Sequence, residues 1–459
     1  MTVPSPFTRA QIHADNWLAS LGHRPVTPSA AHESIEATLG ELADGPCDDA
    51  EVIDLLAGAV EPGLAASGSG RWYGFVIGGA YPVSIAADWL VSAWDQNAGM
   101  LLTTPGVVAV ERTAGRWLLD LLGLPRDSSV GFVTGATTAN QTGILVGRDE
   151  LLRRSGWDPD QGLAGGPPLR VLAGAEVHVS PLQALRYAGL PQSELLAVDA
   201  QGCVLPEALE KALAARPDQP TILLLQAGNI HSGASDPFAE LVPIARRHPV
   251  WVHVDGAFGL WAAASPSLRG LVGGVELADS WATDAHKTLN VPYDCGLVVV
   301  RDPVAHRRAM SMHAPYLFNA EEANPYELVP EMSRRARGVP VWATLKALGR
   351  QGVVDLVDRM HLRARQLADG IAGIEGATVL NDVVFTQVCV GFEDDDRTRA
   401  VVAALLAEGD VWMSGSHWQG RAVLRISVSN WSTSEDDVAR GVAAVARAQA
   451  QTASGSTMA

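Results

Sequence analysis

The sequence predicts an α/β protein with a mostly parallel central sheet flanked by helices. Short apolar segments alternate with segments of helical periodicity between residues 131 and 255, and this alternation is typical of a parallel sheet with helices on both faces. Apolar residues make up 47% of the chain and charged residues 19%, which fits a globular protein and excludes wholesale disorder. A chain of 459 residues is long enough for two or three domains.

Three short helices are expected before the sheet, within residues 1–70. They cover residues 11–21, 32–42 and 48–59, and the last one opens with acidic residues, which favour a helix N-terminus. Short amphipathic helices bury little surface alone. We therefore expect this segment to pack on another element, which a second subunit would provide.

The sheet-forming part is expected to cover residues 71–345, with helices at 82–98 and 107–122 before the alternation begins. Residues 346–446 also alternate between helix and strand, which indicates a smaller C-terminal α+β domain. Residues 447–459 are small and polar, and we expect them to be disordered. Within the larger part, strands beginning at 131, 170, 195, 221 and 251 are separated by helices at 141–153, 180–187, 206–215 and 236–247.

Charge and cysteine content exclude several classes of protein. A net charge of −17 argues against sequence-independent nucleic-acid binding, which needs a basic face. The four cysteines include no C-x-x-C pair, so neither a disulfide framework nor a metal site is expected. The first residues lack a signal-peptide core, and no apolar run reaches the roughly 18 residues of a membrane helix. We expect a soluble, cytoplasmic protein without a membrane partner.

Lys287 stands between two apolar segments, residues 271–281 and 296–300. The pattern predicts a strand, a loop that carries Lys287, and a second strand. Burial disfavours the charged form of a lysine, and the neutral amine can attack an aldehyde to form a Schiff base. The alternative is an exposed lysine in a turn.

The segment 131–140 predicts an anion site. A short strand runs into Gly135-Ala136-Thr137-Thr138-Ala139-Asn140 and then into a helix. Free backbone N–H groups at a helix N-terminus bind phosphate, and Thr137 or Thr138 can add hydroxyl donors. The segment is not a Walker loop and lacks G-x-G-x-x-G. A helix cap with small residues for packing is the alternative.

Three polar residues, His178, Asn229 and Asp255, fall where predicted strands end. Ligands of parallel sheets lie beyond the carboxyl ends of the strands. Asp255 follows an apolar run, and a buried carboxylate needs a strong partner such as a cationic ring nitrogen. His178 can stack flat on an aromatic ring. A turn aspartate and a core histidine are the alternatives.

Two further segments each have two interpretations. Trp72, Tyr73 and Phe75 stand among glycines, which suits either an ordinary core or the wall of a ligand pocket. Residues 311–337 form a long irregular stretch with three prolines, a pattern typical of a lid. The arginines at its end either clamp a phosphate from across a dimer or form a solvated face; they are Arg334, Arg335 and Arg337.

Together these motifs resemble the pyridoxal-phosphate-dependent group II decarboxylases, such as the aromatic-amino-acid and glutamate decarboxylases. The resemblance extends from about residue 8 to residue 446. It implies a fold-type-I enzyme with pyridoxal 5'-phosphate as cofactor, and a homodimer with its sites near the interface. The motifs are residues 135–140, His178-Val179-Ser180, His253-Val254-Asp255-Gly256-Ala257, and the block from Ala278-Asp279-Ser280 to His286-Lys287.

The resemblance also implies roles for individual residues. Lys287 corresponds to the Schiff-base lysine, Asp255 to the partner of the pyridine nitrogen, and His178 to the ring that stacks on the cofactor. Tyr316 corresponds to the loop tyrosine that returns a proton after carbon dioxide leaves. The other implied cofactor contacts are Ala136, Thr137, Thr138, Asn229, Ala257, Asp284 and His286, and the implied substrate contacts are Arg425 and Phe75.

The function that the resemblance implies is decarboxylation of an L-amino acid. Tyr316 favours this outcome because protonation needs a donor. Alternatives on the same fold are a Cα–Cβ lyase or aldolase, an aldehyde synthase, and a protein that binds the cofactor without turnover. Several departures from the family pattern leave substrate and outcome open: Thr288, Asp284, Gln183, Asn229 and Gly256 stand where tryptophan, asparagine, lysine, threonine and alanine are usual.

Overall fold

The computed structural model describes residues 5–311 and 322–455. Tertiary contacts divide the chain into two compact units. The sheet unit comprises residues 78–362 and 381–388, and the terminal unit comprises residues 1–77, 363–380 and 389–459. No helix in the described part is both long and apolar enough to cross a membrane.

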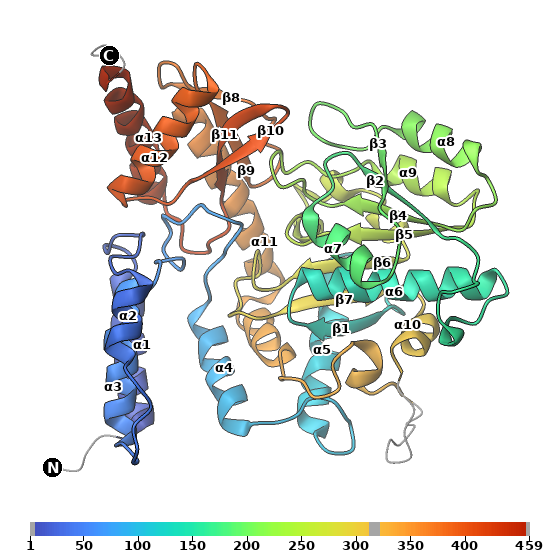
Figure 1. Ribbon diagram of the computed structural model, residues 1–459, viewed down its shortest axis with the longest axis horizontal. Coiled ribbons are helices and arrows are strands. Elements are labelled where there is room, and N and C mark those ends of the chain that lie inside the picture. Colours follow the sequence, from blue (N-terminus) through green and yellow to red (C-terminus); the bar gives the residue numbers. More distant parts are fainter. Residues whose placement is uncertain (1–4, 312–321, 456–459) are drawn as a thin grey trace. The chain divides into compact units, whose positions relative to one another are not determined.

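The sheet unit is built on a seven-stranded sheet with the order β1-β7-β6-β5-β4-β2-β3 (Figure 1). All neighbours from β6 to β3 pair in parallel, whereas β7 runs antiparallel to both β6 and β1. The prediction of a mostly parallel sheet is therefore confirmed. The strands are β1 Ser129–Val133, β2 Arg170–Gly174, β3 Glu194–Leu196, β4 Thr221–Gln226, β5 Val250–Asp255, β6 Ser280–Asp284 and β7 Gly296–Val300.

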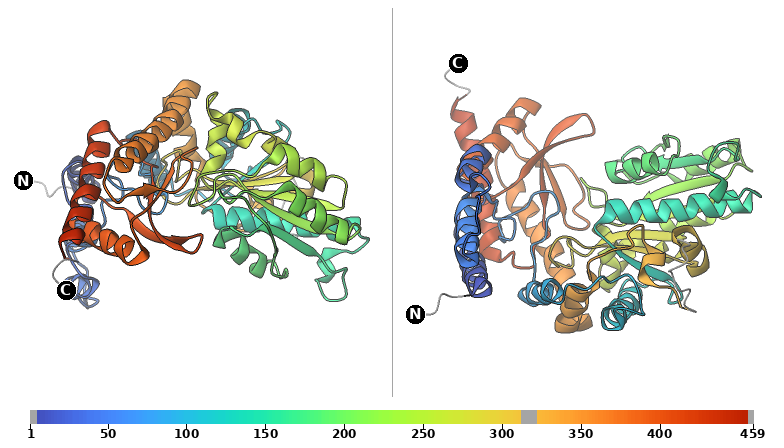
Figure 2. Two further views of the ribbon diagram at one scale, coloured as in Figure 1. Left: turned by 90° about the horizontal axis from the view of Figure 1, so that it is seen from above. Right: turned by 60° about the horizontal axis from the view of Figure 1, so that its bottom comes forward.

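Helix α6, Ala136–Arg154, lies along one face of this sheet against β5, β6 and β7 (Figure 2). Two glycines permit the close approach. A Cβ atom at Gly143 would lie 2.6 Å from the ring of His253, and a Cβ atom at Gly147 would lie 2.4 Å from the ring of Trp251. Larger residues at either position would push the helix away, because protein interiors are close-packed.

Two expectations about elements of the sheet unit are corrected. Helix α6 begins at Ala136 rather than near residue 141, since the small residues after the extended Gly135 are already helical. The apolar run 271–281 is mostly not a strand, because Gly273 and Gly274 interrupt it and β6 begins only at Ser280. The other helices of this unit are α4 Pro82–Trp94, α5 Pro105–Leu121, α7 Val179–Tyr187, α8 Pro206–Ala215, α9 Phe238–Ala245, α10 Pro303–Met310 and most of α11 Gly338–Ala372, with 3-10 turns η2 Pro159–Gln161, η3 Gly259–Ala264, η4 Arg269–Val272, η5 Val275–Leu277 and η6 Pro325–Leu328.

The terminal unit contains the N-terminal helices and most of a four-stranded sheet with the order β10-β11-β9-β8. The pairs β10–β11 and β8–β9 are antiparallel. The expectation of disorder from residue 447 onward is corrected for residues 447–455, because helix α13 continues to Gly455. The elements are α1 Pro6–Ser20, α2 His32–Leu39, α3 Asp49–Val60, η1 Glu61–Gly63, β8 Thr378–Val379, β9 Gln387–Gly391, α12 Asp395–Glu408, β10 Ser414–Trp418, β11 Arg421–Ser427 and α13 Glu435–Gly455.

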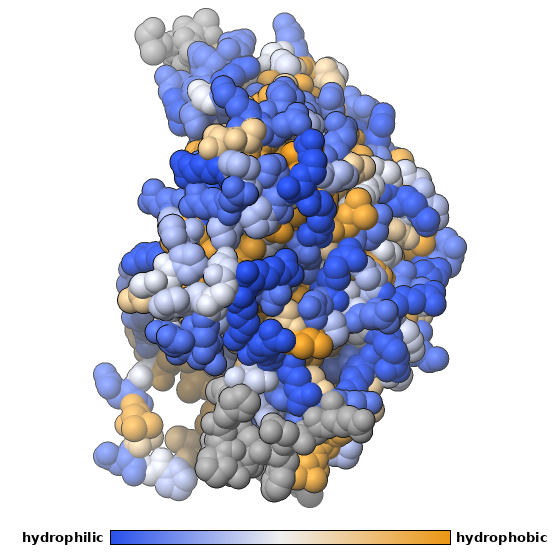
Figure 3. All heavy atoms as spheres, turned by 90° about the vertical axis from the view of Figure 1, so that its right-hand side faces the viewer, coloured by the Kyte–Doolittle hydropathy of each residue, from blue (hydrophilic) through white to orange (hydrophobic). Residues whose placement is uncertain are grey.

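The surface and core of the sheet unit differ in the way that the hydrophobic effect requires. On the face shown in Figure 3, hydrophilic side chains predominate and apolar side chains are scattered between them. The core brings together Ile144 of α6, Leu185 of α7 and Trp251 of β5, each at most 2% exposed. Two histidines, His253 and His306, are also fully buried in this unit.

Because these two histidines are buried, we expect acid to lower the stability of the fold. Burial lowers the pKa of His253 to about 3 and that of His306 to about 4, whereas a histidine in an unfolded chain has a pKa near 6.5. Both stay neutral in the folded chain, so their contribution to stability is present above pH 6.5 and is lost as the pH falls toward 4. At pH 5 the loss is about 2 kcal/mol for each histidine.

Denaturant unfolding at pH 7.5 and pH 5 measures this loss. In the variant His306→Gln the free energy of unfolding should depend less on pH, because glutamine does not titrate and the contribution of His306 is removed. Equal free energies of unfolding at the two pH values would contradict the prediction.

Candidate active site

Lys287 lies just beyond the carboxyl end of β6, in the loop that leads to β7, as the sequence predicts. Its Nζ atom lies 2.9 Å from Oδ2 of Asp284, the last residue of β6. The side chain of Asp284 is 2% exposed and that of Lys287 is 20% exposed. The lysine is therefore held by a buried carboxylate, while its side chain stays partly exposed.

Asp284 also fixes two other predicted residues. Its Oδ1 atom accepts a 2.6 Å hydrogen bond from the backbone N–H of Ala136, at the start of α6. Its Oδ2 atom lies 3.6 Å from Nε2 of His286. His286 Nδ1 accepts from the backbone N–H of Cys295, so a neutral His286 carries its proton on Nε2, facing Asp284. Burial lowers the pKa of His286 and favours this neutral form, although Asp284 opposes the shift.

Asp255 ends β5 and is 7% exposed. Burial raises the pKa of this carboxyl, and the positive charges of His178 and Lys287 oppose the increase. Its Oδ1 atom accepts a 3.1 Å hydrogen bond from the backbone N–H of Ala257. Asp255, His178 and Lys287 thus interact electrostatically at the same edge of the sheet.

His178 and Asn229 follow neighbouring strands at this edge. His178 is the N-cap of α7, and its Nδ1 accepts from the backbone N–H of Ser180 at 3.3 Å. The backbone N–H of His178 donates to Gln226, the last residue of β4. Asn229 Oδ1 accepts from two backbone N–H groups, but its Nδ2 is buried without a partner among the described residues. This donor lies against Gly202, since a Cβ atom at Gly202 would come within 2.6 Å of it.

The two predicted threonines differ in their contacts. Thr137 Oγ1 lies 3.1 Å from Oγ of Ser180, and Thr138 Oγ1 lies 2.9 Å from Oγ1 of Thr134. The turn before them packs tightly on the start of β7, since a Cβ atom at Gly296 would lie 2.5 Å from the backbone of Gly135. The N-terminus of α6 is therefore pressed against the sheet beside Lys287.

The structure does not test three of the predicted site residues. Tyr316 lies outside the described residues, and its role stays a prediction. Phe75 and Arg425 belong to the terminal unit, so their contact with substrate also stays a prediction. Phe75 is 56% exposed, and Arg425 lies on β11, where burial lowers its pKa.

The arginines at residues 334–337 each pair with a different carboxylate, and neither interpretation describes all three. Arg334 is buried and holds Glu111 through two hydrogen bonds of 2.8 and 3.0 Å. Arg335 pairs with Asp88, and Arg337 pairs with Asp294. Arg334 therefore joins α5 to the segment before α11, a structural role that the sequence did not indicate.

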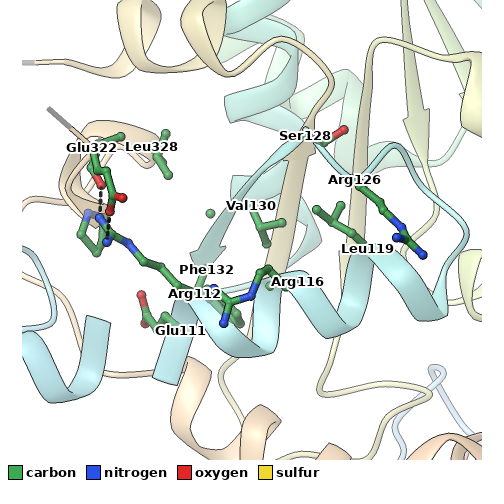
Figure 4. A pocket seen from close by; sticks show the side chains of 14 residues that line it. Glu111, Arg112, Arg116, Leu119, Arg126, Ser128, Val130, Phe132, Glu322 and Leu328 are labelled. Atoms are coloured by element: carbon green, nitrogen blue, oxygen red, sulfur yellow. Dashed lines mark hydrogen bonds and ion pairs between the residues drawn. The ribbon is translucent and has the colours of Figure 1, made fainter. Parts of the chain in front are cut away.

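A cavity of about 400 Å³ lies between α5, β1 and residues 322–328 (Figure 4). Arg112 reaches along its wall to an ion pair with Glu322, and Arg116 and Arg126 line it further along. None of the residues predicted for the site lines this cavity. The chemistry of the residues at the strand ends, rather than cavity size, therefore identifies the candidate active site.

Sequence reasoning missed two contributors to the site. Tyr293 packs against His286 with ring centroids 4.3 Å apart and the ring planes tilted by 31°, and Ser180 contacts Thr137 and His178 together. The one sequence signal for Tyr293 was its position as an aromatic residue in the loop after Lys287. Ser180 was named only as part of the motif His178-Val179-Ser180, and its contacts depend on how α6 and α7 pack.

Comparison with known proteins identifies the family. The family model described as the pyridoxal-dependent decarboxylase conserved domain matches residues 44–392, more than half of the chain. The chain belongs to this family. Membership confirms the predicted resemblance, the pyridoxal-phosphate cofactor and the assignment as a lyase of the decarboxylase type.

Curated relatives of the chain carry several activities. It is 28% identical over 330 residues to acidic amino acid decarboxylase GADL1 of Mus musculus, covering 70% of this chain and 59% of that protein. It is 26% identical over 438 residues to aromatic-L-amino-acid decarboxylase of Bacillus atrophaeus, covering 91% and 89%. It is also 26% identical over 421 residues to phenylacetaldehyde synthase of Arabidopsis thaliana, covering 84% and 83%.

A solved structure described as Oryza sativa TDC with PLP and tryptamine matches with a TM-score of 0.91 at 22% identity, covering 97% of both chains. At this identity the likeness bears on the fold alone, and it confirms the predicted fold class.

Proposed function

We propose that this decarboxylase-family chain removes carbon dioxide from an L-amino acid, with pyridoxal phosphate held at Lys287. The observation that carries the proposal is the arrangement of Lys287, Asp255 and His178 at one edge of the sheet, with the N-terminus of α6 beside them. An amine, a buried carboxylate, an aromatic ring and a helix N-terminus match the aldehyde, ring nitrogen, ring face and phosphate of this cofactor.

The residues present fit the cofactor in detail. Lys287 Nζ provides the amine for its aldehyde, and Asp284 Oδ2 at 2.9 Å can take up the proton that the amine must lose before attack. When bound, the cofactor supplies an electron sink for the bond that breaks.

Three side chains would hold the cofactor and set the charge of its ring. Asp255 would keep a proton on the ring nitrogen, because a buried carboxylate favours a neighbouring positive charge. His178 would stack on the ring and exclude water from one face. Thr137, at the start of α6, would donate its hydroxyl to the phosphate.

A second outcome on the same site is aldehyde formation, which the similarity to phenylacetaldehyde synthase supports. Both reactions begin with loss of carbon dioxide. They differ in whether a proton or molecular oxygen reacts at the carbon from which carbon dioxide leaves. A proton donor, such as the predicted Tyr316, and exclusion of oxygen from the site would favour the amine.

Purified protein incubated with a panel of L-amino acids tests the proposal. We expect one amino acid to give carbon dioxide and amine in equal amounts, measured together with aldehyde and ammonia. Aldehyde and ammonia in place of amine would favour the second outcome. Cleavage of β-hydroxy amino acids without release of carbon dioxide would contradict both.

We also propose that the active enzyme is a homodimer. Helices α1 and α2 contain no buried residue, and α3 carries Leu55 and Leu56, each about half exposed at 47% and 50%. A second copy of the chain would cover these apolar side chains. Light scattering should give the mass of two chains, and Leu56→Ser should weaken the association; a monomer at assay concentration would contradict the proposal.

A further inference from the structure

A continuous series of hydrogen bonds connects the core of the sheet with the candidate phosphate site. His253, on β5, is fully buried, and its Nδ1 and Nε2 atoms lie 2.8 Å from Ser280 Oγ and from Asn140 Oδ1. Asn140 Nδ2 donates to Ser180 Oγ at 3.3 Å, and Ser180 Oγ lies 3.1 Å from Thr137 Oγ1. We call this series the buried relay; its members in order are Trp251, Ser280, His253, Asn140, Ser180 and Thr137.

The donor at the inner end of the relay fixes its direction. The indole N–H of Trp251 can only donate, and it lies 2.9 Å from Ser280 Oγ. In the described residues Ser280 Oγ has no partners other than Trp251 and His253. Ser280 must therefore give its own proton to His253 Nδ1, because a buried hydroxyl proton without an acceptor is costly.

The neutral imidazole transmits this direction to Asn140. Burial lowers the pKa of His253 to about 3, so the ring carries a single proton at neutral pH. With Nδ1 accepting, that proton sits on Nε2 and is donated to Asn140 Oδ1. The amide nitrogen of Asn140 then points toward Ser180. The opposite orientation of the amide would leave the proton of Ser280 without an acceptor.

The outer end of the relay reaches the surface at Thr137. Ser180 is buried, whereas Thr137 is exposed. Because Ser180 Oγ accepts from Asn140, its proton is best donated to Thr137 Oγ1, and the proton of Thr137 is then free. The reverse arrangement would leave the proton of buried Ser180 without an acceptor in the described part of the chain.

We propose that His253 and Asn140 are positioning residues that orient the hydroxyl of Thr137, so that it donates to the phosphate of the cofactor. Neither residue needs to touch the cofactor, and the proposal rests on the function proposed above. Ser180 also bonds Nδ1 of His178, but through its backbone N–H. The relay uses only the hydroxyl of Ser180, so its loss should leave the stacking ring of His178 in place.

Binding of two related aldehydes to the full-length apoenzyme tests the relay. Pyridoxal phosphate uses the Thr137 hydroxyl, whereas pyridoxal lacks the phosphate. We expect His253→Leu to weaken pyridoxal phosphate about tenfold, the value of one hydrogen bond to a charged group, and to leave pyridoxal unchanged. His253→Gln should restore much of the loss, because its amide nitrogen can still donate to Asn140.

His306→Leu is the matched control. His306 is equally buried, and its Nδ1 lies 2.7 Å from Ser129 Oγ on β1. The His306→Leu variant should lower the free energy of unfolding without changing the ratio of the affinities for pyridoxal phosphate and pyridoxal. An equal loss for both aldehydes in His253→Leu, or the same selective loss in His306→Leu, would overturn the proposal.

A spectroscopic measurement covers the case in which His253→Leu does not fold. Nitrogen-15 NMR of the wild-type chain, assigned by comparison with His253→Gln, should show His253 neutral at pH 7 with its proton on Nε2. A proton on Nδ1 would reverse the relay and refute it. If wild-type protein fails to bind pyridoxal phosphate at Lys287, the proposed function fails; if it binds but His253→Leu keeps the wild-type ratio, only the relay fails.

Discussion

Lys287→Met is expected to fold, yet to lose covalent pyridoxal phosphate and nearly all decarboxylation. Removal of the nucleophilic amine takes away the covalent attachment and with it several orders of magnitude in rate. The variant also leaves the buried Asp284 without its cation, which should cost on the order of 3 kcal/mol in unfolding free energy. Absorbance of the bound cofactor, carbon dioxide release and denaturant unfolding measure the three effects.

Lys287→Arg separates the covalent role from the charge. Arginine can keep an ion pair with Asp284 and so retain stability, but it cannot form the Schiff base. Borohydride reduction of wild-type protein should attach the cofactor to the peptide that contains Lys287. The sequence contains only two other lysines, Lys211 and Lys346, so labelling at either would disprove the assignment without ambiguity.

The main features of the fold and site could be predicted because they depend on short stretches of sequence. The apolar strands that end at Gln226 and Asp255 are buried along their length, and such runs stand out without knowledge of their neighbours. A chemically active residue at the end of such a strand, as with Asp255 at the end of β5, is placed at the ligand-binding edge by topology alone.

Other features could not be predicted, because they arise between distant segments. The ion pair of Arg334 with Glu111 joins residues 223 positions apart, and the contact of His253 with Asn140 joins residues 113 positions apart. Each looks like an isolated polar residue in the sequence. The apolar run before β6 was misleading for the opposite reason, since its composition resembled a strand while Gly273 and Gly274 favoured turns.

Asp255→Asn is expected to keep the fold and the cofactor but to lower kcat by roughly 10²–10³, the scale of one preorganised electrostatic contact. Asparagine keeps the size of the side chain and can still accept the hydrogen bond from Ala257 N–H. It lacks the negative charge that would hold a proton on the ring nitrogen, so the electron sink weakens. Steady-state kinetics on the substrate found in the panel measures the loss.

Asp279→Asn provides a matched control. Asp279 is also buried, pairs with Arg246, and accepts from the backbone N–H of Val252. It stands just before β6, at the opposite end of that strand from Lys287. Its loss should lower stability and leave kcat close to that of wild type.

A change of cofactor distinguishes electrostatics from packing at Asp255. A pyridoxal phosphate analogue methylated on the ring nitrogen is permanently cationic and needs no carboxylate to hold a proton. In Asp255→Ala, which leaves room for the methyl group, this analogue should recover part of the rate that normal cofactor does not. Near-normal kcat in Asp255→Asn, or an analogue no better than the normal cofactor in Asp255→Ala, would show that Asp255 acts only in packing.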